Sequence, residues 1–124
     1  MTARPRDTAP ERIAMPTETG EAWLAVADIL CIEAADNFTY FFMKDGQKLV
    51  FAKTVGRVEE MLEGCGFCRP HRSHLVNRAA VRAYFPRGED PHLELFNGYR
   101  VPVSRRWRTM VAEFFPQNDT GLGA

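Results

Sequence analysis

The chain has 124 residues, no net formal charge, 45% hydrophobic residues and three cysteines. This length fits one domain with a modest core. Neither an apolar run of about 18 residues nor a basic start followed by an apolar stretch is visible, which argues against a membrane span and a secretory signal. We therefore expect a cytoplasmic protein. The odd number of cysteines favours reduced thiols over a disulfide framework.

The two ends of the sequence lack the patterns of packed elements. Residues 1–21 are rich in Pro, Thr, Glu and Arg and contain no aromatic residue, so they predict a disordered leader or the end of a linker. Residues 116–124 start with a helix-stopping proline and carry little apolar surface, which predicts a flexible tail. We expect the folded domain to cover residues 22–115.

The first half of this domain predicts short strands and one helix. Residues 23–34 hold two apolar runs broken near Asp28, and residues 38–43 and 47–52 are β-rich runs that flank a Lys-Asp-Gly turn. A helix should follow Thr54, which can cap its N-terminus, because the next apolar residues fall at helical spacing before a glycine.

The second half predicts a strand, a hairpin and a C-terminal helix. Residues 79–85 predict the strand, and residues 92–96 and 99–103 flank an Asn-Gly pair that is a strong signal for a type I′ turn. Ser104 can cap a helix whose apolar residues recur at i, i+3, i+4 and i+7. Those residues are Trp107, Met110, Val111 and Phe114.

Positive charge is concentrated late in the chain. Residues 69–108 contain nine arginines, three acidic residues and no lysine, a net charge of +6. A guanidinium group can fork onto phosphate or onto a guanine edge, so this segment favours a nucleic-acid ligand. A solvated basic face that has no ligand is the alternative.

Two cysteines and two histidines are spaced three residues apart. They are Cys65, Cys68, His71 and His74. This spacing brings four ligands together only on a helix, which the nearby glycines and proline disfavour, and on a strand it sends side chains to opposite faces. A metal- or redox-sensing small β protein that uses these four residues is therefore the alternative function. Our first expectation is a protein without a bound metal or cofactor.

No pattern in the sequence indicates catalysis. Ser73 lies between two histidines, but side chains so close in sequence rarely form a nucleophile and base, and no nucleophile elbow or glycine-rich phosphate loop is present. The aromatic residues at 38–42 suit stacking on single-stranded nucleic acid, yet several of them must fill the core. We expect a protein that is not an enzyme.

Three segments carry a resemblance to a known family. The segments IEAADNFTYFFMKDG (residues 32–46), FCRPHRSHLVN (67–77) and NGYRVPVSRRW (97–107) resemble the LytTR DNA-binding domain, the output domain of many bacterial response regulators. The resemblance implies a mainly β fold of short, mostly antiparallel strands with two or three short helices, including the C-terminal amphipathic helix. It also implies DNA binding through loops in successive major grooves, without a recognition helix.

The resemblance also implies which residues contact DNA. Arg72 and Arg105 are the candidates for reading bases, and each has the fork geometry for the O6 and N7 atoms of guanine. The first loop is placed only by its neighbourhood, where Asn37 and Thr39 are the candidates. The remaining candidates are expected to hold phosphate or to shape the motif: Lys53, His71, Ser73, Ser104 and Arg106. For Ser104, capping the helix is the alternative role.

Together these features predict a regulator of transcription that binds double-stranded DNA and reads its sequence. We expect two copies to act on repeated half-sites. Nothing in residues 1–22 resembles a receiver or a sensor domain. The sequence is therefore expected to be either a fragment that follows an upstream signalling domain or a stand-alone regulator controlled by abundance or by a partner protein.

Overall fold

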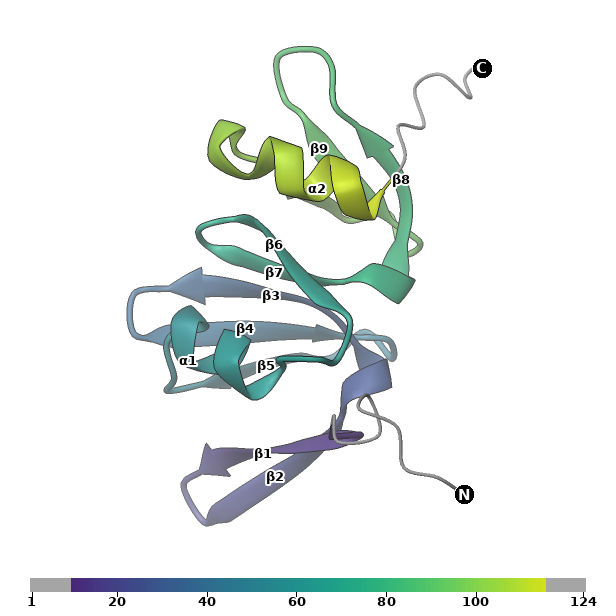
Figure 1. Ribbon diagram of the computed structural model, residues 1–124. Helices are drawn as coiled ribbons and strands as arrows, with labels where there is room; N and C mark the ends of the chain where they lie inside the picture. The colour runs from purple at the N-terminus through teal and green to yellow at the C-terminus, as the bar shows by residue number, and fades with distance from the viewer. Residues whose placement is uncertain (1–9, 116–124) are drawn as a thin grey trace, which may run out of the picture.

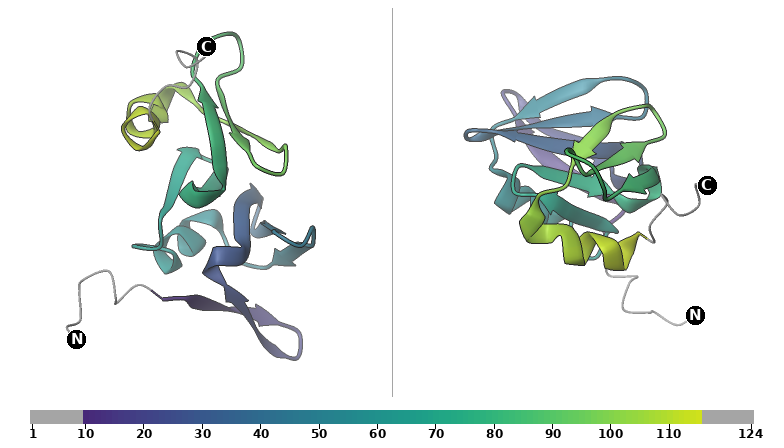
Figure 2. Two further views of the ribbon diagram at one scale, coloured as in Figure 1. Left: turned by 90° about the vertical axis from the view of Figure 1, so that its right-hand side faces the viewer. Right: turned by 90° about the horizontal axis from the view of Figure 1, so that it is seen from above.

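The computed structural model describes residues 10–115, and these residues form a mainly β fold. Their strands make three antiparallel sheets that are stacked along one axis, with a five-stranded sheet in the middle (Figures 1 and 2). The prediction of short, mostly antiparallel strands with a few short helices is therefore confirmed. No helix in this part of the chain is long and apolar enough to cross a membrane.

The central sheet has the strand order β5-β4-β3-β7-β6. Its strands are β3 (Ile29–Ala35), β4 (Phe38–Met43), β5 (Lys48–Phe51), β6 (Phe67–His71) and β7 (His74–Asn77). Strand side chains alternate between the two faces of a sheet, and in β4 the residues Thr39, Phe41 and Met43 are buried on one face. This alternation divides the core into two clusters, one on each face of the sheet.

The first cluster lies beneath what we call the N-terminal cover, made of β1 (Arg12–Thr17), β2 (Gly20–Ala25) and α1 (Val55–Met61). Thr54 caps α1 as predicted, since its side chain accepts a hydrogen bond of 3.3 Å from the backbone N–H of Arg57. The buried side chains of Val58 and Leu62 then face the central sheet, as their helical spacing requires.

The hairpin in this cover corrects one prediction. Residues 12–21 are not a disordered leader, because β1 and β2 pair along their length, from Arg12 opposite Ala25 to Thr17 opposite Gly20. Ile13 and Met15 alternate into the core and are 4% and 0% exposed. Two side chains of β1 are buried in the core, and most of the others are exposed. The composition of the whole segment is therefore polar, although the strand is ordered. Residues 1–9 lie outside the described part of the chain.

The second cluster lies beneath the C-terminal cover. This cover consists of β8 (Val81–Phe85), β9 (His92–Leu95), β10 (Arg100–Pro102), the 3-10 turn η4 (Arg105–Trp107) and α2 (Arg108–Phe114). The predicted strand and hairpin are confirmed, since β9 and β10 pair on either side of Asn97-Gly98. The predicted type I′ turn is wrong, because Gly98 has a φ of 93° but Asn97 does not have a positive φ. The N–H of Gly98 donates to the carbonyl of Leu95 at 2.9 Å, so the tight turn lies one residue earlier and Gly98 follows it in the conformation that glycine favours. Two more 3-10 turns, η2 (Val26–Asp28) and η3 (Arg78–Ala80), join the sheets.

The C-terminal helix differs from its prediction at its start. The chain leaves Ser104 as a 3-10 turn, and the α-helix proper begins at Arg108. The hydroxyl of Ser104 makes no capping bond; instead its carbonyl accepts from the N–H of Trp107 at 3.1 Å. Val111 is fully buried in the second cluster and Met110 packs against it, as the predicted apolar stripe requires. The predicted flexible tail, residues 116–124, lies outside the described residues.

Candidate nucleic-acid interface

Three segments that are far apart in sequence meet at one edge of the molecule. They are the β3–β4 turn (residues 36–37), the β6–β7 turn (residues 72–73) and η4, on the left in Figure 1. The N–H of Ala34, near the end of β3, donates to the carbonyl of Ser73 at 2.8 Å, which holds the β6–β7 turn beside the end of β3. The N–H of Ser104 donates to the carbonyl of Pro70 at 2.9 Å, which joins the start of η4 to β6. We call this region the loop edge.

The antiparallel register explains why these turns are neighbours. Glu33 pairs with His74 at the end of β3, so the turn that follows β3 lies beside the turn that precedes β7. At the outer strand, Phe51 pairs with Thr39, so β5 also ends at this edge. Lys53, which is half-buried, follows it before α1 begins. The candidate contacts from four segments are therefore brought to one side.

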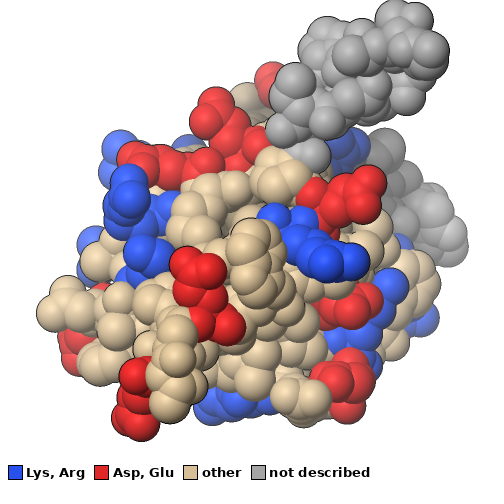
Figure 3. Space-filling view, turned by 90° about the horizontal axis from the view of Figure 1, so that it is seen from below, with Lys and Arg blue, Asp and Glu red and all other residues tan. Residues whose placement is uncertain are grey.

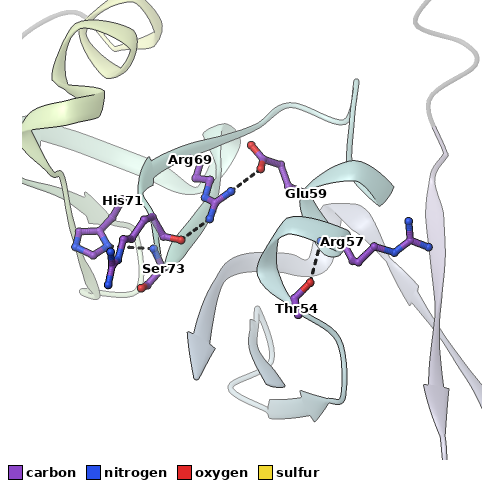
Figure 4. Close-up of polar contacts among 7 residues, drawn as sticks. Thr54, Arg57, Glu59, Arg69, His71 and Ser73 are labelled. Carbon is purple, nitrogen blue, oxygen red and sulfur yellow. Dashed lines mark hydrogen bonds and ion pairs between the residues drawn. The ribbon is translucent and has the colours of Figure 1, made fainter. Parts of the chain in front are cut away.

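The β6–β7 turn is short and held by hydrogen bonds. His71 pairs with His74 across it, which leaves only Arg72 and Ser73 at the tip. The N–H of Ser73 donates to Nδ1 of His71 at 3.1 Å, and the guanidinium of Arg69 donates to the carbonyl of Arg72 (Figure 4). The side chain of Arg72 stays exposed. His71 and Ser73 thus shape the turn, as predicted, and leave Arg72 accessible.

His74 supports this turn from inside. Its ring meets the ring of His71 edge to face, with centroids 5.3 Å apart, and its Nε2 lies 3.6 Å from Oε2 of Glu33. Burial lowers the pKa of His74, the carboxylate of Glu33 opposes that shift, and the neighbouring His71 adds to it. A neutral His74 therefore packs at the base of the hairpin near neutral pH.

The turn η4 presents two arginines. Arg105 and Arg106 are both exposed, and within residues 10–115 neither forms an ion pair with an acidic side chain. The guanidinium of Arg106 lies 5.4 Å from the ring centroid of Trp107, a cation–π distance. Ser104 is half-buried, and its Oγ finds no hydrogen-bond partner in this part of the chain. Arg105 is thus the less constrained cation of the pair.

Of the two contacts predicted at or next to the β3–β4 turn, only Asn37 is exposed. Asn37 is exposed beside Asp36, which adopts a left-handed φ of 57°. Thr39 is 0% exposed, so its predicted contact with DNA does not fit the structure. The physical reason is the period of two in a strand: Phe41 is a core residue, and Thr39 must share its face. That signal was available in the sequence.

The sequence analysis missed cations that the fold adds to the loop edge. A groove of about 580 Å³ lies between the β8–β9 loop, which contains Arg87, and the segment that carries Arg105 and Arg108, and His71 also lines it. Arg105 and Arg108 share one face because they are three residues apart on the helical turn. The same loop also contributes Glu89 and Asp90, which offset part of this charge.

Two other regions of the described residues differ from the loop edge. The face that carries the β1–β2 hairpin has acidic and basic side chains interspersed among uncharged ones (Figure 3). At the opposite ends of the central strands, a groove of about 1090 Å³ is lined mainly by Val26, Leu30, Ala80 and Phe96 and their neighbours. Arg72 and Arg105, for which residues 10–115 provide no acidic partner, both lie at the loop edge.

The cysteines and histidines of the alternative function do not converge. Cys65 packs against the first core cluster and Cys68 is buried in the second, so they lie on opposite sides of the sheet. Burial raises the pKa of the Cys68 thiol to about 12, which disfavours the thiolate that binds metals. Within residues 10–115, no three His, Cys, Asp or Glu side chains are placed to hold a metal ion. The structure gives the metal-sensing alternative no support.

Comparisons with known proteins decide the family. Residues 22–115 match the LytTr DNA-binding domain family. The chain belongs to the LytTR family. Among solved structures it is similar to a chain named as the LytTr DNA-binding domain of a methyl-accepting/DNA response regulator from Bacillus cereus, with 24% sequence identity and a TM-score of 0.72 over 85% of this chain and 96% of that chain. No curated protein sequence matches the chain.

Membership in the LytTR family gives the domain a ligand class, because the family is one of DNA-binding domains. The structural likeness, at this level of identity, shows that the fold is shared. The match begins at residue 22 and so leaves out β1, although the side chains of β1 fill the core.

Proposed function

We propose that this LytTR domain is a sequence-specific regulator of transcription that reads the major groove of double-stranded DNA with the loop edge. The observation that carries the proposal is the convergence of Asn37, Arg72 and Arg105 from three exposed turns, held together by backbone hydrogen bonds. Arginine and asparagine are the side chains that pair bidentately with guanine and adenine. Lys53, Arg106 and Arg108 supply charge for phosphates at the same edge.

The width of the loop edge supports contact with more than one groove. Five strands at a spacing of about 4.8 Å extend over about 19 Å from β5 to β6, and η4 lies beyond β6. A major groove is about 12 Å wide. The whole row therefore does not fit one groove, and its ends must reach flanking phosphates or the next groove.

The proposal includes the setting of the domain. We place it in the cytoplasm of a bacterium as the output part of a response regulator, where an upstream signalling domain or a partner protein controls it. Two copies on repeated half-sites would multiply the few base contacts that one loop edge offers. Sedimentation of the saturated complex would show two proteins on each duplex, and one protein on each duplex would contradict this part of the proposal.

The decisive experiment starts with selection from a randomised duplex pool, followed by fluorescence anisotropy on the enriched duplex and on a shuffled duplex. We expect Arg72→Ala and Arg105→Ala each to cost about 1–3 kcal/mol of preference for the enriched duplex. Lys53→Ala should weaken binding to both duplexes alike. It should also lower the salt slope, the dependence of the logarithm of the binding constant on the logarithm of the salt concentration, by about one. Lys44→Ala, at the opposite end of β4, is the matched control and should change neither quantity. If no duplex is enriched over random DNA, the proposed function is wrong.

A further inference from the structure

We propose that Arg69 is a positioning residue that sets the base preference of the loop edge without contacting DNA. It does so by holding the β6–β7 turn, which carries Arg72, and η4, which carries Arg105, in one arrangement. This inference rests on the proposed function, because it concerns how the same edge reads DNA.

The guanidinium of Arg69 faces three elements at once. Its Nη1 lies 2.8 Å from Oε1 of Glu59 on α1, and its Nη2 donates to the carbonyl of Arg72 (Figure 4). Its central carbon lies 5.7 Å from the ring centroid of Trp107 in η4. Only 23% of its side chain is exposed. A planar group with forked donors and a flat face can make these three contacts together.

These contacts constrain the two segments that carry the reading arginines. The bond to the carbonyl of Arg72 fixes the backbone from which that side chain extends. On the other side, Trp107 belongs to the same 3-10 turn as Arg105, and the N–H of Ser104 binds the carbonyl of Pro70, the residue next to Arg69. A change at Arg69 therefore reaches both reading positions through contacts that are already formed.

A change at Glu59 distinguishes this positioning role of Arg69 from a direct contact between Arg69 and phosphate. In the structure its carboxylate neutralises Arg69, and a phosphate contact would require the guanidinium to leave that partner. Replacement of Glu59 by glutamine removes a negative charge and weakens the ion pair. If Arg69 bound phosphate, this change would strengthen binding to every duplex; if Arg69 positions the turn, the change loosens the turn and lowers preference.

A matched control is present on the same helix. Glu60 pairs with Arg57 at 2.9 Å, and both side chains are about two-thirds exposed, 68% and 66%. Glu60→Gln therefore makes the same change of charge on α1 without touching Arg69. Any effect of net charge alone is shared by the two variants.

The experiment measures the affinity ratio between the enriched and the shuffled duplex, the salt slope and the thermal unfolding of the full chain. We expect Glu59→Gln to lower the ratio about fivefold and Arg69→Lys about tenfold, a part of the discrimination that forked arginine contacts provide. The affinity for the shuffled duplex should stay the same or rise slightly. Glu60→Gln should keep the ratio of the unaltered chain. For Arg69→Gln, the salt slope should stay unchanged while the ratio falls.

Other outcomes would overturn the inference. A salt slope lower by about one in Arg69→Gln, with equal loss on both duplexes, would make Arg69 a phosphate contact. Loss of binding only in proportion to the unfolded fraction would make it a structural brace. Absence of any preference in the unaltered chain would refute the proposed function itself, an outcome that is visible before any variant is tested.

Discussion

The N-terminal and C-terminal covers pack on opposite faces of one sheet, yet they differ in what they do. The N-terminal cover buries Ile13, Met15 and Leu24, and none of its elements is one of the three turns that form the loop edge. The C-terminal cover buries Val101 and Val111, and the connection within it is η4, which reaches the loop edge. The N-terminal cover thus approaches the loop edge through Glu59 of α1, which pairs with Arg69, whereas the C-terminal cover places η4 directly at the edge that we propose to contact DNA.

The largest expected effect breaks the N-terminal cover. Met15 is fully buried, so Met15→Ala should lower the free energy of unfolding by about 2–5 kcal/mol through lost contacts and a cavity. The preference of the folded protein for its duplex should not change. Chemical denaturation measures the first quantity and anisotropy the second. Thr17→Ala, at an exposed position of β1, is the control and should stay within about 0.5 kcal/mol.

An unchanged free energy of unfolding in Met15→Ala would contradict the role of the hairpin in the core. It would show that residues 12–21 do not contribute to the stability of the fold.

A smaller loss of stability is expected in the C-terminal cover, with an added effect on binding. Val111→Ala should cost about 1–3 kcal/mol, because two buried methyl groups are lost. Since α2 continues directly from η4, the same change should also lower the preference for the enriched duplex. Thr109→Ala, exposed on the same helix, should affect neither quantity. If Val111→Ala lowers stability but leaves the preference for the enriched duplex unchanged, the C-terminal cover affects stability only, and the expected coupling is wrong.

The smallest expected change in stability concerns Thr39, next to the β3–β4 turn. Thr39 is buried on the face of the N-terminal cover, and its Oγ1 has no partner within the described residues. Thr39→Val should therefore change stability by at most about 1 kcal/mol, in the stabilising direction, and leave DNA binding unchanged. Asn37→Ala, at the exposed tip, should weaken the preference in the same anisotropy assay. A loss of DNA affinity in Thr39→Val would show that the threonine reaches DNA.

Local signals predicted much of this fold. The hairpin needs positive φ at Gly98, and the cap at Thr54 needs a hydroxyl three residues before a free N–H. Each of these signals lies within a few residues of its effect, so a single sequence reveals it. The resemblance to the LytTR family then predicted how these elements combine into one fold, and the family match and the structure confirm that prediction.

The features that sequence reasoning missed depend on contacts between distant segments. Ile13 and Met15 are informative only once a sheet face exists to receive them. Arg69 looked like one more cation in a basic stretch, and its partners, Glu59 and Trp107, lie 10 and 38 positions away. Ser104 had the residue type of a helix cap, but the start of the helix as a 3-10 turn left its hydroxyl without that bond. Tertiary packing decided each case.

The hydrogen bond between Ala34 and Ser73 involves only main-chain atoms. The spacing between the two neighbouring turns is thus independent of which side chains occupy their tips. Under the proposed function, Asn37 and Arg72 can therefore be replaced without moving the backbone from which their side chains extend. These two positions are the first choice for redesigning the DNA sequence that the domain prefers.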